Sequence, residues 1–157
     1  MSHADELRAA LEPVLATVTT IDPSAPDARA RLEAALPITS PAIAAVRSAL
    51  RAAVEAREVA DREAGGVRFS RLAKAATPEA WSVDVVHMTG PGPGHTHPNG
   101  EIDLCFAVRG APQFDGADEG WTAYPAGSWH VPTVAGGAMD ILYFLPGGAI
   151  RFEPKPG

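Results

Sequence analysis

The sequence predicts a mainly β protein, an antiparallel sandwich or small barrel, preceded by about three helices. After residue 66, apolar and polar residues alternate in several runs, which is the period of strands with one buried face. Before that point, apolar residues recur at every third or fourth position, as they do along amphipathic helices. The length suits one domain. We therefore expect a helical segment over residues 1–65 and a β-unit over residues 66–157.

The first two expected helices are marked by apolar spacing and by prolines. Apolar residues form one stripe along residues 7–18, and Pro13 inside that stripe is expected to kink the helix or divide it. A second, short helix is expected within residues 22–37, where Pro37 closes it.

The third expected helix has signals at both ends. Ser40 is a good N-cap residue, Pro41 suits the first helical turn, and the helical pattern continues to Gly65 and Gly66. The three helices are too short and too rich in alanine to bury a large core alone. We therefore expect them to pack on the β-unit or on a partner subunit.

The strands of the β-unit are separated by turns rich in glycine and proline. Turn sequences such as TGPGPG, FDGADEG, VAGG and LPGG divide the alternating runs at spacings of about ten residues. We expect strands within residues 67–75, 80–88, 101–110, 120–127 and 138–148, and a short last one within residues 150–154.

Composition and charge exclude several functional classes. Hydrophobic residues make up 46% of the chain, which supports a folded core and argues against wholesale disorder. The net charge is −6 and no long basic cluster occurs, which argues against nucleic acid and an anionic membrane as partners. No apolar run approaches the roughly 20 residues of a membrane-spanning helix, and the N-terminus has no signal core. We expect a cytoplasmic protein without an internal disulfide, since Cys105 is its single cysteine.

The stretch PGPGHTHPNGEIDLCF contains three good metal ligands. His95 and His97 are two residues apart, and Glu101 follows after four more, so in an extended segment all three face the same side. The same side carries Asp103 and Cys105, and the opposite side carries Ile102, Leu104, Phe106 and Val108. The first side would line a cavity, and the apolar side needs a cover of helices or a second sheet.

A third histidine, His130, follows the turn of the stretch GWTAYPAGSWHVPT. A neighbouring strand could bring it beside His95, His97 and Glu101. Three imidazoles and one carboxylate leave one or two positions open on a divalent ion, as a catalytic metal site requires. The ligand types suit Fe, Mn, Zn or Ni and do not distinguish among them.

The spacing of these ligands resembles the two sequence motifs of the cupin superfamily, across roughly residues 67–152. His95, His97 and Glu101 fit the first motif. The second motif is matched by Gly120, Pro125, Gly127 and His130. The sequence departs from the usual motifs at four points, none of which is a ligand. Gly90 is one residue closer to His95 than usual, and Gly110 is two residues further from Glu101. One residue fewer than usual separates Gly120 from Pro125, and Val134 stands where an asparagine often closes the second motif. The resemblance implies a small antiparallel β-barrel, or jelly roll, with one metal ion inside.

A narrower resemblance extends over most of the chain. The helical leader with HTHPNGEIDLCF, GWTAYPAGSWHVPTVAGG and ILYFLPGG resembles the small bacterial family of 4-hydroxylaminobenzoate lyases. This resemblance implies conversion of 4-hydroxylaminobenzoate and water to 3,4-dihydroxybenzoate and ammonia, a step in nitrobenzoate degradation.

Such chemistry assigns expected roles to further side chains. Glu101 or Asp103 could protonate the leaving hydroxyl group. An arginine would bind the benzoate carboxylate; Arg68 and Arg109 are our candidates, and Arg71 and Arg151 remain open. We also expect His87, Trp129 and Tyr143 to contact the substrate.

Three other readings remain open at this point. The same ligands would suit an Fe(II) dioxygenase acting on an aromatic substrate. A non-catalytic cupin could sense a metal or a small ligand, and a purely structural β-domain would make the ligand set a coincidence. We expect a homodimer, because a barrel with an apolar outer face and a helical leader often pairs with a second copy.

Overall fold

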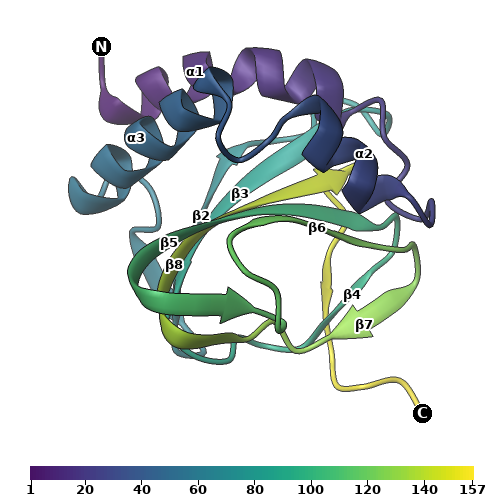
Figure 1. Cartoon of the computed structure of the whole chain (residues 1–157). Coiled ribbons are helices and arrows are strands. Elements are labelled where there is room, and N and C mark those ends of the chain that lie inside the picture. The colour runs from purple at the N-terminus through teal and green to yellow at the C-terminus, as the bar shows by residue number, and fades with distance from the viewer.

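The structure, a computed structural model, describes residues 1–157 and consists of three helices followed by nine strands (Figure 1). This arrangement confirms the predicted mainly β fold with N-terminal helices. The helices are α1 (His3–Val18), α2 (Ala28–Ala35) and α3 (Pro41–Glu55). The strands are β1 (Arg62–Ala64), β2 (Val67–Ala73), β3 (Trp81–Met88), β4 (His95–His97), β5 (Glu101–Phe114), β6 (Gly120–Tyr124), β7 (Ser128–His130), β8 (Val134–Pro146) and β9 (Arg151–Phe152).

The strands form two antiparallel sheets. The large sheet has the order β1-β2-β3-β8-β5-β6, and the small sheet has the order β7-β4-β9. The helices lie over one face of the large sheet, and the small sheet lies on its other side (Figure 1). The space between the two sheets is therefore the interior of a small barrel, and the helices are outside it.

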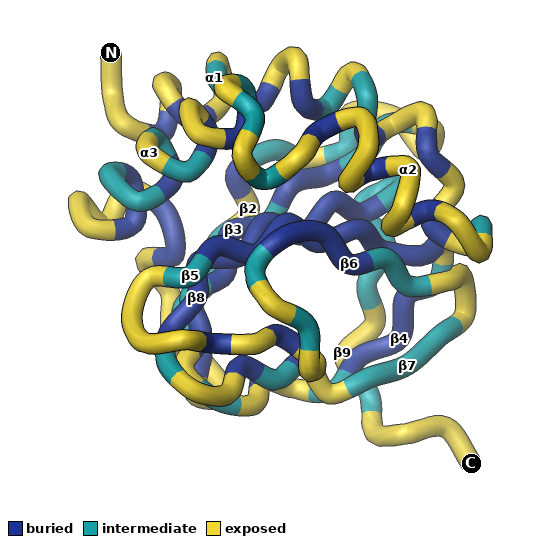
Figure 2. The backbone as a smooth tube through the Cα atoms, viewed as in Figure 1, coloured by how far each residue is buried: buried dark blue, intermediate teal, exposed yellow.

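The alternation of side chains along β5 fills two separate apolar cores. Ile102, Leu104 and Phe106 are buried and belong to a cluster that contains residues of all three helices. Cys105 points the other way, into a smaller cluster inside the barrel. Buried backbone accordingly runs along the middle of the large sheet (Figure 2). The helices therefore provide the cover that the sequence predicted for the apolar side of β5.

Helix α3 ends ten residues before the predicted end. Its last residue is Glu55, and residues 62–64, which we expected to be helical, form strand β1 instead. The connection is fixed by tertiary contacts: the Ala60 amide donates to the Ser70 hydroxyl at 2.8 Å, and the Arg68 guanidinium donates to the carbonyls of Ala60 and Val54. These contacts outweigh the helix propensity of the segment.

Helix α1 runs without interruption through Pro13, so of the two predicted effects of this proline, a kink or a division of the helix, the division does not occur. Both long helices have serine N-caps, with the Ser2 and Ser40 hydroxyls accepting from the amides of Asp5 and Ile43. None of the helices is long and apolar enough to span a membrane.

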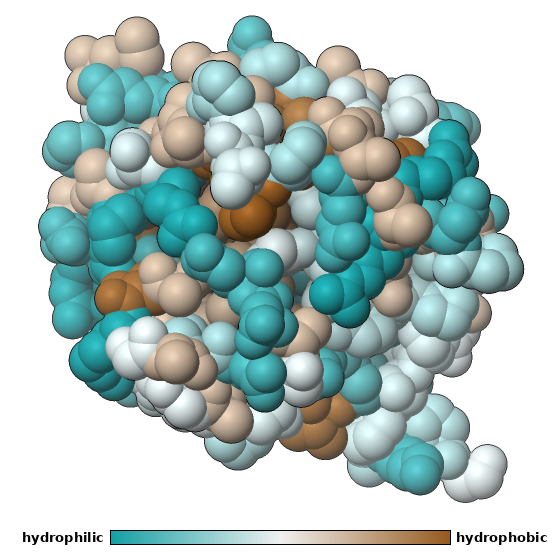
Figure 3. Space-filling view, in the orientation of Figure 1, coloured by the Kyte–Doolittle hydropathy of each residue, from teal (hydrophilic) through white to brown (hydrophobic).

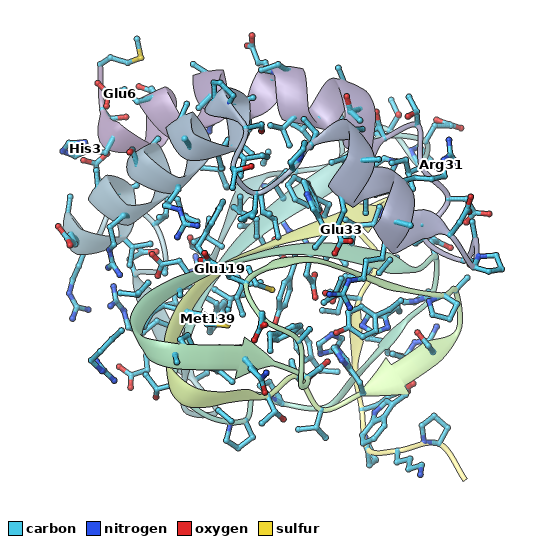
Figure 4. The ribbon with its side chains drawn as sticks, viewed as in Figure 1. His3, Glu6, Arg31, Glu33, Glu119 and Met139 are labelled. Carbon is cyan, nitrogen blue, oxygen red and sulfur yellow. The ribbon has the colours of Figure 1, made fainter.

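Helix α3 is joined to the sheet by a polar contact as well as by the core. Arg47 lies over the ring of Phe106 and forms an ion pair with Glu119 at 2.9 Å. Glu119, labelled in Figure 4, lies beneath α3 at the start of β6. On the face drawn in Figure 3, strongly hydrophobic colour is confined to small, separated spots.

Candidate metal centre

The four predicted ligands meet inside the barrel. Strand β4 carries His95 and His97, the neighbouring strand β7 carries His130 directly opposite His95, and Glu101 is the first residue of β5. His95, His97 and Glu101 are at most 1% exposed, and His130 is partly buried. One ligand atom from each of the four residues lies within 4.8 Å of all the others.

The distances between these atoms are close to those between ligands of a single ion. The Nε2 atoms of His95 and His130 are 3.2 Å apart, and Glu101 lies 3.5 Å from Nε2 of both His95 and His97 and 4.0 Å from Nε2 of His130. Ligands bound at about 2.1 Å on adjacent positions of a metal ion would be roughly 3.0–3.4 Å apart. The donor set is thus of the right type for a divalent transition metal, and its atoms, spread over as much as 4.8 Å, would draw slightly closer around a bound ion.

The cluster also contains buried polar atoms that nothing in the protein satisfies. Both carboxylate oxygens of Glu101 and Nε2 of His97 are buried without a hydrogen-bond partner. An unsatisfied buried polar atom is costly, and an ionised one more so. A cation among these atoms would satisfy them all, so the residues present fit a bound metal.

Hydrogen bonds at the opposite ring nitrogens aim the histidines at this point. Nδ1 of His95 donates to the Pro93 carbonyl at 3.2 Å, and Nδ1 of His97 donates to the Ser128 hydroxyl at 2.9 Å. The Ser128 hydroxyl itself donates to the Pro125 carbonyl, so it can only accept from the imidazole. Each ring is thereby held as the tautomer whose Nε2 lone pair is free for a metal.

His130 is oriented by a carboxylate that sequence reasoning missed. Nδ1 of His130 lies 2.7 Å from Asp115, which also accepts from the Tyr124 hydroxyl at 2.6 Å and the Thr133 amide at 2.9 Å. Burial acts to raise the pKa of Asp115, but His130 and Tyr124 outweigh it and lower that pKa. Asp115 lies in an Asp-Gly turn, which in the sequence indicates only the boundary of a strand. The only sequence feature that could have pointed to its role is a charged residue in a turn one strand before His130.

The two acidic residues at the cluster have opposite electrostatics. Burial would raise the pKa of Glu101, but the imidazoles of His95 and His97, whose Nε2 atoms lie 3.5 Å from its carboxylate, outweigh it and bring that pKa to about 2. Asp103 is fully buried too, and burial together with the charge of Glu101 raises its pKa well above the usual range. The cluster therefore holds one charged carboxylate among its imidazoles.

Replacing Asp115 with asparagine is expected to weaken metal binding about 10- to 100-fold, the usual cost of losing a partner that orients a metal-binding histidine. The amide keeps the shape of the side chain but loses the charge that supports His130. Competition with a chelator of known affinity would measure the change. Asp118→Asn is the matched control, because Asp118 is exposed and bonds only to Gln113. Equal affinities of the two variants would contradict the orienting role of Asp115.

A cavity of about 490 Å³ adjoins the cluster on the side of His95. Its volume lies in the range of small-molecule sites. Most of its wall is apolar; the charged side chains on the wall are Arg62, Arg71 and Asp84, and His95 lies where the wall meets the cluster. The remaining lining residues are Ala64, Gly65, Val67, Phe69, Ser70, Val86, Met88, Gly92, Pro93, Pro132, Tyr143, Ile150 and Phe152.

Of the five predicted substrate contacts, only Tyr143 lines this cavity. Its ring is buried and lies 6.1 Å from that of His95. Trp129 lies between Ser128 and His130 on β7, so its side chain faces away from the barrel interior. Outside the barrel, its indole packs on Gly94. A Cβ atom added to Gly94 would lie 2.6 Å from this ring, and the indole N–H donates to the Glu153 carbonyl. Trp129 therefore packs on strand β4 outside the barrel and does not line the cavity.

His87, Arg68 and Arg109 also lie away from the cluster and the cavity. His87 shares the helix-facing side of β3 with Val83 and Val85, and its ring bonds to Asp140 at 2.8 Å. Arg68 binds the carbonyls at the end of α3, as described above. Arg109 is exposed, beyond the irregular pairing at the middle of β5.

A cluster of three histidines and a glutamate between two antiparallel sheets, in the order of the two sequence motifs, gives the protein the cupin-like fold and ligand arrangement that those motifs implied. The lyase DddQ of Ruegeria pomeroyi DSS-3, which acts on DMSP, aligns over 99% of this chain and 98% of its own length, with a TM-score of 0.50 and 19% identity. That likeness concerns the fold alone.

Sequence comparison identifies the family. A family model described as PnbB: 4-hydroxylaminobenzoate lyase matches residues 10–152, so the chain belongs to the 4-hydroxylaminobenzoate lyase family. Proteins named 4-hydroxylaminobenzoate lyase from Nocardioides sp. (strain LMS-CY) and Pseudomonas putida are 32% and 35% identical to it. The matches cover 62% and 54% of this chain and 64% and 51% of the two relatives, less than two thirds of their length.

Proposed function

We propose that this protein is a metal-dependent lyase that converts 4-hydroxylaminobenzoate and water to 3,4-dihydroxybenzoate and ammonia. The observation that carries the proposal is the cluster of His95, His97, Glu101 and His130, beside a mostly apolar cavity, in a chain of this family. The reaction is balanced without an oxidant or a reductant. One water adds to the ring carbon beside the nitrogen as the N–O bond breaks, the N–O oxygen leaves as water, and a second water hydrolyses the resulting imine to the second ring hydroxyl and ammonia.

The chemistry requires that the N–O bond be weakened and that water reach the neighbouring ring carbon. A divalent ion held by the four ligands would act as a Lewis acid and lower the pKa of bound water. The residues of the chain do the rest: the apolar wall holds the ring and limits the access of bulk water, and His95 and Tyr143 lie where the cavity meets the cluster.

The leaving hydroxyl group needs a proton. Glu101 is occupied as a ligand in this arrangement, so we assign the acid to Asp103, which lies on the same side of β5. Asp103 is opposite Tyr143 in the register of β5 and β8, but only Tyr143 lines the cavity. A proton from Asp103 would therefore pass by way of Tyr143 or a water molecule.

The proposal is tested with purified protein and 4-hydroxylaminobenzoate, with and without oxygen. We expect 3,4-dihydroxybenzoate and ammonia in equal amounts in both atmospheres, loss of activity after chelation and recovery with one divalent metal. Asp103→Asn should lower kcat about 100-fold or more, as is usual when a general acid is removed. Product formation that consumes oxygen would favour the Fe(II) dioxygenase instead, and full activity of Asp103→Asn would remove the proposed acid.

A further inference from the structure

We propose that Arg62 binds the carboxylate of the substrate at the outer end of the cavity, and that the opposite end of the aromatic ring lies at His95 and Tyr143. The inference rests on the proposed function for the identity of the substrate, a para-substituted benzoate. It concerns a residue that no sequence pattern singles out, since residues 62–64 read as the end of a helix.

The register of the large sheet puts Arg62 on the inner face. Arg62 pairs with Phe69 on β2, Phe69 pairs with Val86 on β3, and Val86 pairs with Ile141 on β8. Directly opposed residues in an antiparallel sheet point to the same side. Since Val86 and Ile141 belong to the core inside the barrel, the Arg62 side chain rises on the same side, where it lines the cavity.

Arg62 carries the unpaired positive charge of this wall. Arg71, the other arginine of the cavity, is held by Asp84 through two contacts of 2.7 and 3.2 Å, and it also donates to the Gly148 carbonyl. The Arg71–Asp84 ion pair is neutral overall, and it leaves few N–H groups of Arg71 free to bind a ligand. Arg62 has neither an ion pair nor a side-chain hydrogen bond, so its planar guanidinium is free to bind a carboxylate with two parallel hydrogen bonds.

The separation along the sheet leaves room for one ring between the side chains of Arg62 and Tyr143. Strands β1, β2, β3 and β8 are successive neighbours, so Arg62 and Tyr143 belong to strands three spacings of about 4.8 Å apart. Phe69 and Val86 lie between them on the cavity wall and supply an apolar surface for the ring. A benzoate whose carboxylate reaches Arg62 would thus direct its para substituent towards His95.

The test is a binding measurement that needs no turnover. Calorimetry would compare 4-aminobenzoate, which lacks the N–O bond, with the uncharged 4-aminobenzamide in the metal-loaded wild type, Arg62→Gln and Arg62→Lys. We expect Arg62→Gln to weaken 4-aminobenzoate binding about tenfold or more, Arg62→Lys to recover part of that loss, and 4-aminobenzamide to bind all three alike. Arg31→Gln is the control for net charge, because Arg31 is exposed on α2 without an ion pair (Figure 4).

The outcomes separate this inference from the proposed reaction. Equal binding of 4-aminobenzoate to the wild type and Arg62→Gln, an equal loss for the amide, or no binding to the wild type would each overturn the role of Arg62. If binding depends on Arg62 but the wild type does not convert 4-hydroxylaminobenzoate, the carboxylate site stands and the proposed reaction fails. If the wild type turns over and Arg62→Gln has an unchanged KM, the role of Arg62 fails and the reaction stands.

Discussion

Replacing His130 with alanine is expected to weaken metal binding by at least about 100-fold, because losing a direct ligand costs more than losing a residue that only orients one. Activity that depends on the metal should fall with it. His130 is the most informative ligand to remove, because it comes from β7, far along the chain from His95 and His97. It is also the least buried of the four, so its loss disturbs the core least. Elemental analysis and chelator competition would measure the metal bound by each protein.

His3→Ala is the matched control, since His3 is exposed at the start of α1 and contacts only Glu6. We expect it to bind metal as the wild type does. If His130→Ala also kept the wild-type affinity while folding normally, His130 would not be a ligand. The remaining residues would then have to hold the ion without it.

Replacing Trp121 with alanine is expected to lower the free energy of unfolding by about 3–5 kcal/mol, the usual cost of removing a large aromatic side chain from a core. Trp121 is 1% exposed on β6, lies 6.0 Å from the ring of Phe144, and belongs to the core between the helices and the sheet. Its indole N–H also donates to the Leu36 carbonyl at the end of α2 at 2.8 Å. Urea unfolding followed by circular dichroism would measure the change.

Trp121→Phe separates packing from hydrogen bonding in this prediction. It keeps most of the ring but leaves the Leu36 carbonyl without its partner, so we expect a smaller loss of about 1–3 kcal/mol. Trp129→Phe removes an indole that packs outside the barrel and should cost less than Trp121→Ala. If Trp121→Ala unfolded at the same urea concentration as the wild type, the helices would not be held on the sheet by this core.

The clustering of the candidate metal ligands was predictable because three of them are close in sequence and share one side of an extended segment. His95, His97 and Glu101 share one parity, and parity along a strand fixes the side to which a residue points. His130 was predictable only through the spacing of the second motif. The pairing of β4 with β7 is a long-range contact that no local pattern reports.

The substrate contacts were harder to predict, because they depend on which side of each strand is inside. Both sides of β3 are apolar: Val83 and Val85 face the helices, and Val86 and Met88 face the barrel. The pattern around His87 therefore could not show that it faces the helices.

The positions of the candidate arginines were hard to predict for a different reason. Strand β1 exists because its hairpin pairs with β2, whereas its own residues favour a helix. Arg62 could therefore be found only from the sheet. Arg68 is bound to the end of α3 by contacts that likewise exist only in the folded chain.

The central claim is that one ion is bound by three imidazoles and one carboxylate inside the barrel. X-ray absorption at the edge of the bound metal, on protein loaded to one ion per chain, measures this most directly. We predict about three imidazole nitrogens at roughly 2.0–2.2 Å, and one fewer in His130→Ala. An ion surrounded only by oxygen, or an identical imidazole signal in His130→Ala, would contradict it.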